Sequence, residues 1–111
     1  MIHAEMSEAV RRAVSQTDQS EDMSAVVDRA RSALVDAEGI SLFGLETDHP
    51  ELGTMHWIVG QPAGEEPSYL VLAIAGHVED GEERAMFSAA GADLDAAFRQ
   101  VICECGMTEA A

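Results

Sequence analysis

Three histidines that lie near Asp and Glu residues, His49, His56 and His77, are the side chains of this chain best suited to chemistry. Imidazole and carboxylate groups are common protein ligands of Zn²⁺ and other divalent ions. No HExxH or Cys-x-x-Cys spacing places such ligands together on one element. A small metal-binding protein or enzyme that uses the three histidines is therefore an alternative reading. A solvated acidic rim is the commoner role for residues of these types, so we expect no cofactor.

Other signals of catalysis are weak. Ser88 and His77 are the one serine and histidine that a sheet would bring together, and no motif supplies an orienting acid. Neither GxGxxG nor GxxxxGK[ST] is present, so no loop is built for phosphate. Cys103 and Cys105 are two residues apart, and on a helix such side chains point about 200° away from each other. We expect free thiols and no catalytic residue.

The charge of the chain is its strongest physical feature. There is no lysine, and six arginines face 21 Asp and Glu residues, for a net charge of −15 over 111 residues. Such a surface repels nucleic acid and anionic membranes and attracts basic partners over about 8 Å at physiological salt. Two other causes give the same bias, namely a high-GC genome and adaptation to high salt. In the second case the chain would be a halophile-adapted domain whose charge serves only solvation.

The spacing of apolar residues predicts the elements that must position these groups. A period near 3.6 residues indicates amphipathic helices, and a period of two indicates strands. The expected helices span residues 3–16, 22–38 and 93–105, and the expected strands span 40–47, 54–61, 69–77 and 82–89. The predicted fold class is therefore α+β, with two N-terminal helices, a four-stranded antiparallel β-meander and a C-terminal helix packed on the sheet.

The length and composition predict one domain over residues 1–111, with frayed ends at 1–4 and 107–111. Hydrophobic residues make up 47% of the chain, which is enough to build a core. The apolar stretch from Tyr69 to Gly76 is too short to span a membrane, and the first residues do not resemble a signal peptide. We expect a cytoplasmic protein.

The turns predict how the strands align. Asp80-Gly81 is a typical two-residue hairpin turn, which would place Ile74 opposite Phe87 and His77 opposite Arg84. A loop at 62–67 would place Trp57 opposite Leu72. One face of the sheet would then carry the larger side chains and form, with the last helix, a single core. Its expected members are Trp57, Val59, Leu70, Leu72, Ile74, Phe87, Leu94 and Phe98.

The other predicted face is apolar but small, with histidines at its margin. Its self-association residues would be Ile58, Val71, Ala73, Ala75 and Met86. A solvated sheet face normally alternates with polar residues, so something must cover this one. The expected cover is a second copy in a homodimer, and the first helix or a partner protein is the alternative.

The function expected from these features is that of a non-catalytic acidic binding or regulatory protein that engages a basic surface of a protein partner. Inhibitors, immunity proteins and chaperone-like proteins, including mimics of nucleic acid, are the classes of this size and charge. A meander places its first and third connections at the same end of the sheet. The expected partner-binding residues are at that acidic end: Asp48, Glu51, Glu79, Asp80, Glu82 and Glu83.

Overall fold

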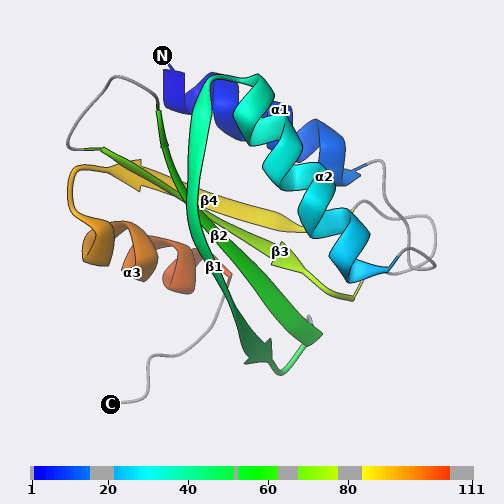
Figure 1. Cartoon of the computed structure of the whole chain (residues 1–111). Coiled ribbons are helices and arrows are strands. Elements are labelled where there is room, and N and C mark those ends of the chain that lie inside the picture. The colour runs from blue at the N-terminus through cyan, green and yellow to red at the C-terminus, as the bar shows by residue number, and fades with distance from the viewer. Residues whose placement is uncertain (1, 16–21, 52, 63–67, 78–83, 106–111) are drawn as a thin grey trace.

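The order of helices and strands in the computed structural model is the predicted one (Figure 1). The structure describes residues 2–15, 22–51, 53–62, 68–77 and 84–105. The elements are α1 (Ile2–Ser15), α2 (Met23–Asp36), β1 (Gly39–His49), β2 (Gly53–Pro62), β3 (Tyr69–Ala75), β4 (Met86–Gly91) and α3 (Leu94–Glu104). The predicted α+β fold class is thereby confirmed.

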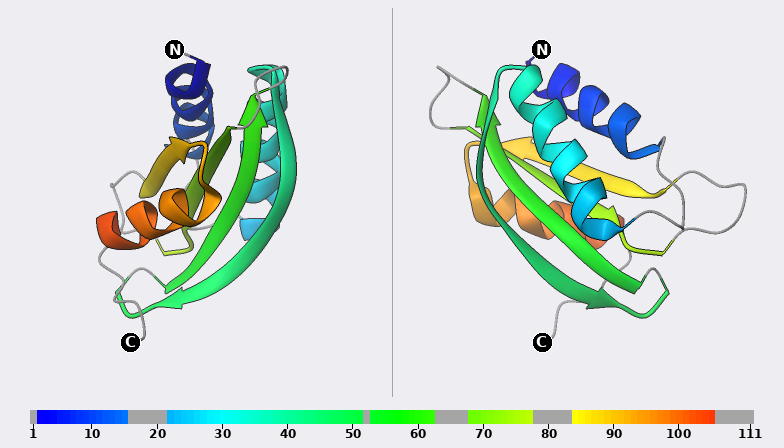
Figure 2. Two further views of the ribbon diagram at one scale, coloured as in Figure 1. Left: turned by 90° about the vertical axis from the view of Figure 1, so that its left-hand side faces the viewer. Right: turned by 45° about the vertical axis from the view of Figure 1, so that its right-hand side comes forward.

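The four strands form one antiparallel sheet in which neighbours in sequence are neighbours in space, in the order β1-β2-β3-β4. Helices α1 and α2 pack on one face of the sheet and α3 packs on the other (Figure 2). We call these the α1/α2 face and the α3 face. No helix within the described residues has the length and apolar character needed to cross a bilayer.

Helix α2 shows how the local sequence sets an element and its buried side. The Asp22 carboxylate caps the helix by accepting a hydrogen bond from the backbone N–H of Ser24, at 3.2 Å. Buried side chains at Val26, Ala30 and Leu34 recur every four residues and therefore line one side of the helix. That side packs onto the sheet and holds α2 in place.

The sheet is apolar on both faces, and each face has its own cluster of buried residues. The cluster on the α1/α2 face includes Met6, Val10 and Leu34 from the helices and Ile58, Leu70, Leu72, Ile74 and Met86 from the strands. The cluster on the α3 face includes Met55, Trp57, Val59, Val71, Ala73 and Ala75, with Phe87, Leu94 and Phe98 packed against it. The sheet is therefore the middle layer of three, and the prediction of a single core is wrong.

The error comes from a one-residue difference in the alignment of β3. Trp57 pairs with Ala73, where Leu72 was predicted, and Phe87 also pairs with Ala73, where Ile74 was predicted. Because side chains alternate between faces, a shift of one residue moves every side chain of a strand to the opposite face. Trp57 and Phe87 still lie on the same face, as predicted, so β3 alone has its two faces exchanged.

The predicted Asp80-Gly81 turn lies outside the described residues. The ladder pairs Ile74 with Met86, one residue away from the Ile74–Phe87 pair that a two-residue turn at 80–81 would give. Arg84 precedes β4 and is not paired with His77 in the ladder. Its guanidinium Nη1 instead donates to the backbone carbonyls of Ala75 and Gly76, at 2.9 and 3.1 Å. The predicted opposition of His77 and Arg84 is therefore wrong.

Candidate functional site

Two of the six residues predicted for the acidic end, Asp48 and Glu51, are among the described residues. Asp48 is the last exposed residue of β1, Glu51 lies in the turn after β1, and both side chains are exposed. Glu79, Asp80, Glu82 and Glu83 lie outside the described residues. The first and third connections do start at the same end of the sheet, because the N–H of Gly76 donates to the carbonyl of Thr54 at 2.8 Å.

His49 is a structural residue in this arrangement. Its side chain is buried, and its Nδ1 accepts a hydrogen bond from the backbone N–H of Glu51, at 3.0 Å. A neutral ring that accepts at Nδ1 carries its proton on Nε2, which therefore donates to the carbonyl of Cys105, at 2.7 Å. His49 thus ties the β1–β2 turn to the C-terminal end of α3, and both ring nitrogens are engaged.

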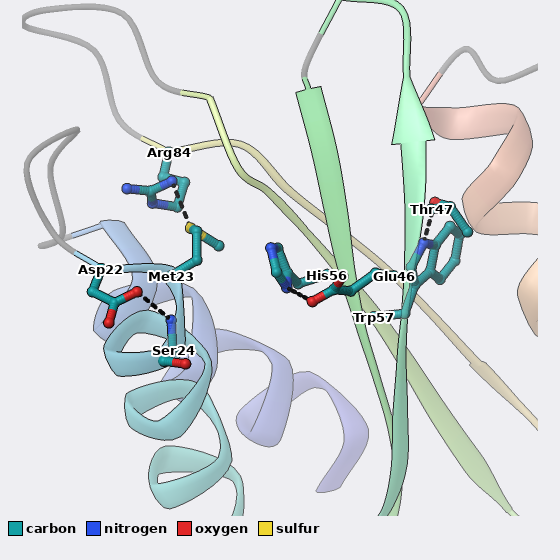
Figure 3. Close-up of polar contacts among 8 residues, drawn as sticks. All are labelled: Asp22, Met23, Ser24, Glu46, Thr47, His56, Trp57 and Arg84. Atoms are coloured by element: carbon teal, nitrogen blue, oxygen red, sulfur yellow. Dashed lines mark hydrogen bonds and ion pairs between the residues drawn. The ribbon is translucent and has the colours of Figure 1, made fainter.

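The three candidate metal ligands are distributed over different parts of the fold. His56 lies on the α1/α2 face, where its Nδ1 is 3.5 Å from a carboxylate oxygen of Glu46, whereas the neighbouring Trp57 points to the other side of β2 (Figure 3). His49 belongs to the α3 side, and His77 follows the end of β3. Among the described residues, no three His, Cys, Asp or Glu side chains are close enough to hold an ion.

Ser88 and Arg84 are also engaged in structural contacts. The hydroxyl of Ser88 is 2.9 Å from the hydroxyl of Ser7, which links β4 to α1. Arg84 is only 4% exposed, and besides the two carbonyls its Nη1 is 3.3 Å from the sulfur of Met23 (Figure 3). One of the six arginines is therefore used inside the fold and adds little positive charge to the surface.

The residues predicted for self-association do not form one surface. Ile58 and Met86 lie beneath α1 and α2, whereas Val71, Ala73 and Ala75 lie on the α3 face. All five are buried within the chain. The structure corrects the basis of that prediction, since the helices already cover both faces of the sheet at these positions.

Strand β1 presents an exposed apolar surface that the sequence analysis did not identify. It is an edge strand, since its ladder contacts are with β2 alone in the described sheet (Figure 2). Ile40, Leu42, Phe43 and Leu45 are between 38% and 45% exposed. A long edge strand with exposed apolar residues is a ready template for another strand, and soluble proteins usually protect such edges.

A bulge divides β1 into two parts. Ser41 pairs with Gly60 and Phe43 pairs with Val59, so Leu42 is an extra residue in the ladder. From Phe43 to His49 the pairing with β2 is regular. The segment from Phe43 to Asp48, which we call the β1 edge, is therefore the exposed part with regular strand geometry.

The β1 edge has chemically different faces. Directly paired residues of neighbouring strands share a face, so the partners in β2 assign each side chain. The side chains of Phe43, Leu45 and Thr47 lie on the α3 face, opposite Val59, Trp57 and Met55. Gly44, Glu46 and Asp48 lie on the α1/α2 face, opposite Ile58, His56 and Thr54. One face of the edge is therefore largely apolar and the other is acidic.

A groove runs along the acidic side of this edge. It has a volume of about 510 Å³ and lies between α2 and the first two strands, with Val27, Asp28 and Arg31 on one wall and Gly44, Glu46 and His56 on the other. The Arg31 guanidinium lies over Gly44, with Nη2 at 2.8 Å from where a Cβ atom would be. Gly44 thereby makes room for Arg31 in the groove, which Asp28 and Glu46 also line.

Comparisons with protein-family models, with curated proteins and with solved structures found no match to this chain.

Proposed function

We propose that this chain is a non-catalytic binding or regulatory protein that engages a basic surface of a protein partner. The observation that carries the proposal is the β1 edge, where exposed apolar side chains lie next to exposed carboxylates. Apolar contacts of this kind supply affinity once they are buried, and the surrounding charge raises the rate of association with an oppositely charged partner.

The distribution of positive charge supports the same proposal. The five exposed arginines all lie on helices, at Arg11, Arg12, Arg29, Arg31 and Arg99. The strands and the β1–β2 turn, as far as they are described, carry no exposed arginine, and the chain has no lysine. A basic partner that approaches β1 therefore meets carboxylates at Glu46, Asp48 and Glu51, together with the guanidinium of Arg31 over Gly44. We place this activity in the cytoplasm, where the free thiols of Cys103 and Cys105 stay reduced.

Charge reversal tests the proposal. The immobilised protein is exposed to an extract of the organism that encodes it, at low and at high salt, and the proteins retained are identified. The test variant carries Asp48→Lys with Glu51→Lys, and the matched control carries Glu8→Lys with Asp95→Lys on helices α1 and α3. Each substitution of an acidic residue by Lys raises the net charge by two units, so both double variants have a net charge of −11 where the original chain has −15.

We expect the original chain to retain a basic protein in stoichiometric amount at low salt and to release it at high salt. The control variant should also retain this protein, and the test variant should not. Equal retention by both variants, or no retention at low salt, contradicts the proposal and leaves the charge as an adaptation for solvation. Stoichiometric metal in the purified protein that is lost on His77→Ala would favour the metal-binding alternative instead.

A further inference from the structure

We infer that the β1 edge, from Phe43 to Asp48, binds an extended segment of another protein as an additional strand, and that apolar residues alternate with Lys or Arg in that segment. This inference rests on the proposed function and specifies how the basic partner is held. Strand addition at an exposed edge obtains affinity from main-chain hydrogen bonds and specificity from alternate side chains. The regular pairing of this segment with β2 shows that its backbone already has the required geometry.

The pattern of the partner follows from the two faces of the edge. An added strand places its side chains alternately on the two faces of the extended sheet. On the α3 face they lie beside Phe43, Leu45 and Thr47, where apolar or β-branched residues pack well. On the α1/α2 face they lie beside Glu46 and Asp48, where Lys or Arg forms favourable cross-strand pairs.

The groove provides room for the basic side chains. It opens between α2 and β1 on the acidic side of the edge, and Asp28 adds a second carboxylate opposite Glu46. A long cationic side chain can place its methylene groups against Val27 and its charge between these carboxylates. Arg31 is the one arginine among the lining residues, and it reduces the attraction for a basic ligand. Removing its charge should therefore strengthen binding.

A second copy of this chain fits the β1 edge poorly. If the β1 edges of two copies pair antiparallel with Glu46 at the centre, the two Glu46 side chains face each other. If Thr47 is at the centre, each Glu46 faces Asp48 of the other copy. Pairing about Leu45 still leaves the Glu46 side chains diagonal to one another across the new ladder. Like charges directly opposite are destabilising in a sheet, and each copy also carries a net charge of −15. Charge complementarity therefore selects a basic segment over a homodimer.

The test uses peptides selected against the full chain. The library contains random displayed peptides about ten residues long, the length of a long strand. It is selected at physiological salt against the original chain and, in a second selection, against the control variant Glu8→Lys/Asp95→Lys. The best peptide is then synthesised in three forms: unmodified, with backbone N-methyl groups on its odd residues, and with N-methyl groups on its even residues. A shuffled peptide of the same composition, in which the basic residues are contiguous, is the control for charge alone.

The inference predicts selected peptides in which apolar and basic residues alternate. One N-methylated form should bind at least about tenfold more weakly, a change of 1.4 kcal/mol in binding free energy, because only one set of amides faces β1. The other form should bind like the unmodified peptide. The shuffled peptide should bind weakly, and Arg31→Ala should tighten binding of the selected peptide about two- to fivefold through loss of like-charge repulsion.

Three outcomes would overturn strand addition. The first is that selection yields no peptide above background. The second is that both N-methylated forms bind as well as the unmodified peptide. The third is that the shuffled peptide binds equally. In the last two cases, peptide binding that is lost at high salt would still support the proposed engagement of basic partners. If no basic peptide binds and the charge-reversal test also fails, strand addition and the proposed function are both refuted.

Discussion

Replacement of Leu34 by Ala should destabilise the protein strongly, because this side chain joins α2 to the sheet. Leu34 is fully buried, and its two methyl groups lie 2.8 and 2.7 Å from the ideal Cβ positions of Gly39 and Gly60. The absence of side chains at the two glycines is what allows this contact. Leu34→Ala removes three carbon atoms, worth about 0.8 kcal/mol each in transfer free energy, and the cavity adds to that loss.

The expected loss in the free energy of unfolding is about 3–4 kcal/mol, within the ~2–5 kcal/mol range of buried Leu→Ala changes. This is a large part of the ~5–15 kcal/mol that stabilises a typical domain. The matched control is Val35→Ala at the next position of the same helix, where the side chain is 56% exposed. A change within about 0.5 kcal/mol is expected for the control, as for most surface substitutions.

Urea unfolding followed by tryptophan fluorescence is the appropriate assay. Trp57 is the only tryptophan, is 3% exposed, and lies on the α3 face, on the far side of the sheet from Leu34. A cooperative domain should report the loss of Leu34 through Trp57 as an earlier midpoint with an unchanged slope. If Leu34→Ala costs no more than Val35→Ala, the packing of α2 on the sheet through Leu34 is refuted.

Three further predictions concern the contacts that join the layers and the two thiols. His49→Phe should lower the free energy of unfolding by about 1–3 kcal/mol, since the buried carbonyl of Cys105 loses its donor; Asp48→Ala is the control, and equal midpoints in urea would contradict the role of His49. Arg84→Met should cost about 2–4 kcal/mol through loss of two charge-assisted hydrogen bonds, and a melting temperature equal to that of the original chain would show that these bonds contribute nothing. Iodoacetamide should modify exposed Cys103 rapidly and buried Cys105 only after unfolding. Equal modification rates of the two thiols in the folded protein, measured by mass spectrometry, would be inconsistent with the burial of Cys105 at the end of α3.

The order of the elements could be predicted because hydrophobic periodicity differs between helices and strands. The alignment of β3 could not, and the reason lies in its composition. Every residue from Leu70 to Ala75 is apolar and buried, so alternation carries no information on which side chains face which helix. The predicted alignment therefore rested on the turn signals at 62–67 and 80–81, and the observed pairs on both sides of β3 differ from it by one residue.

The candidate site was predicted only at its acidic end. Asp48 and Glu51 were predicted from their charge and from the topology of the meander, and both side chains are exposed. The apolar residues of β1 were missed because Leu42 and Phe43 are adjacent, and apolar residues at both odd and even positions are typical of a strand buried on both faces. The signal was nevertheless present, since the first strand of a meander is an edge strand.

Amide hydrogen exchange, measured residue by residue by NMR with and without the selected peptide, tests the central claim most directly. Strand addition predicts that bound peptide slows exchange at every second amide between Phe43 and Asp48, because the intervening amides already face β2. Amides of β4, at the opposite edge of the sheet, should be unchanged. Slowed exchange confined to other segments, or unchanged exchange throughout the β1 edge while the peptide is bound, would contradict the account.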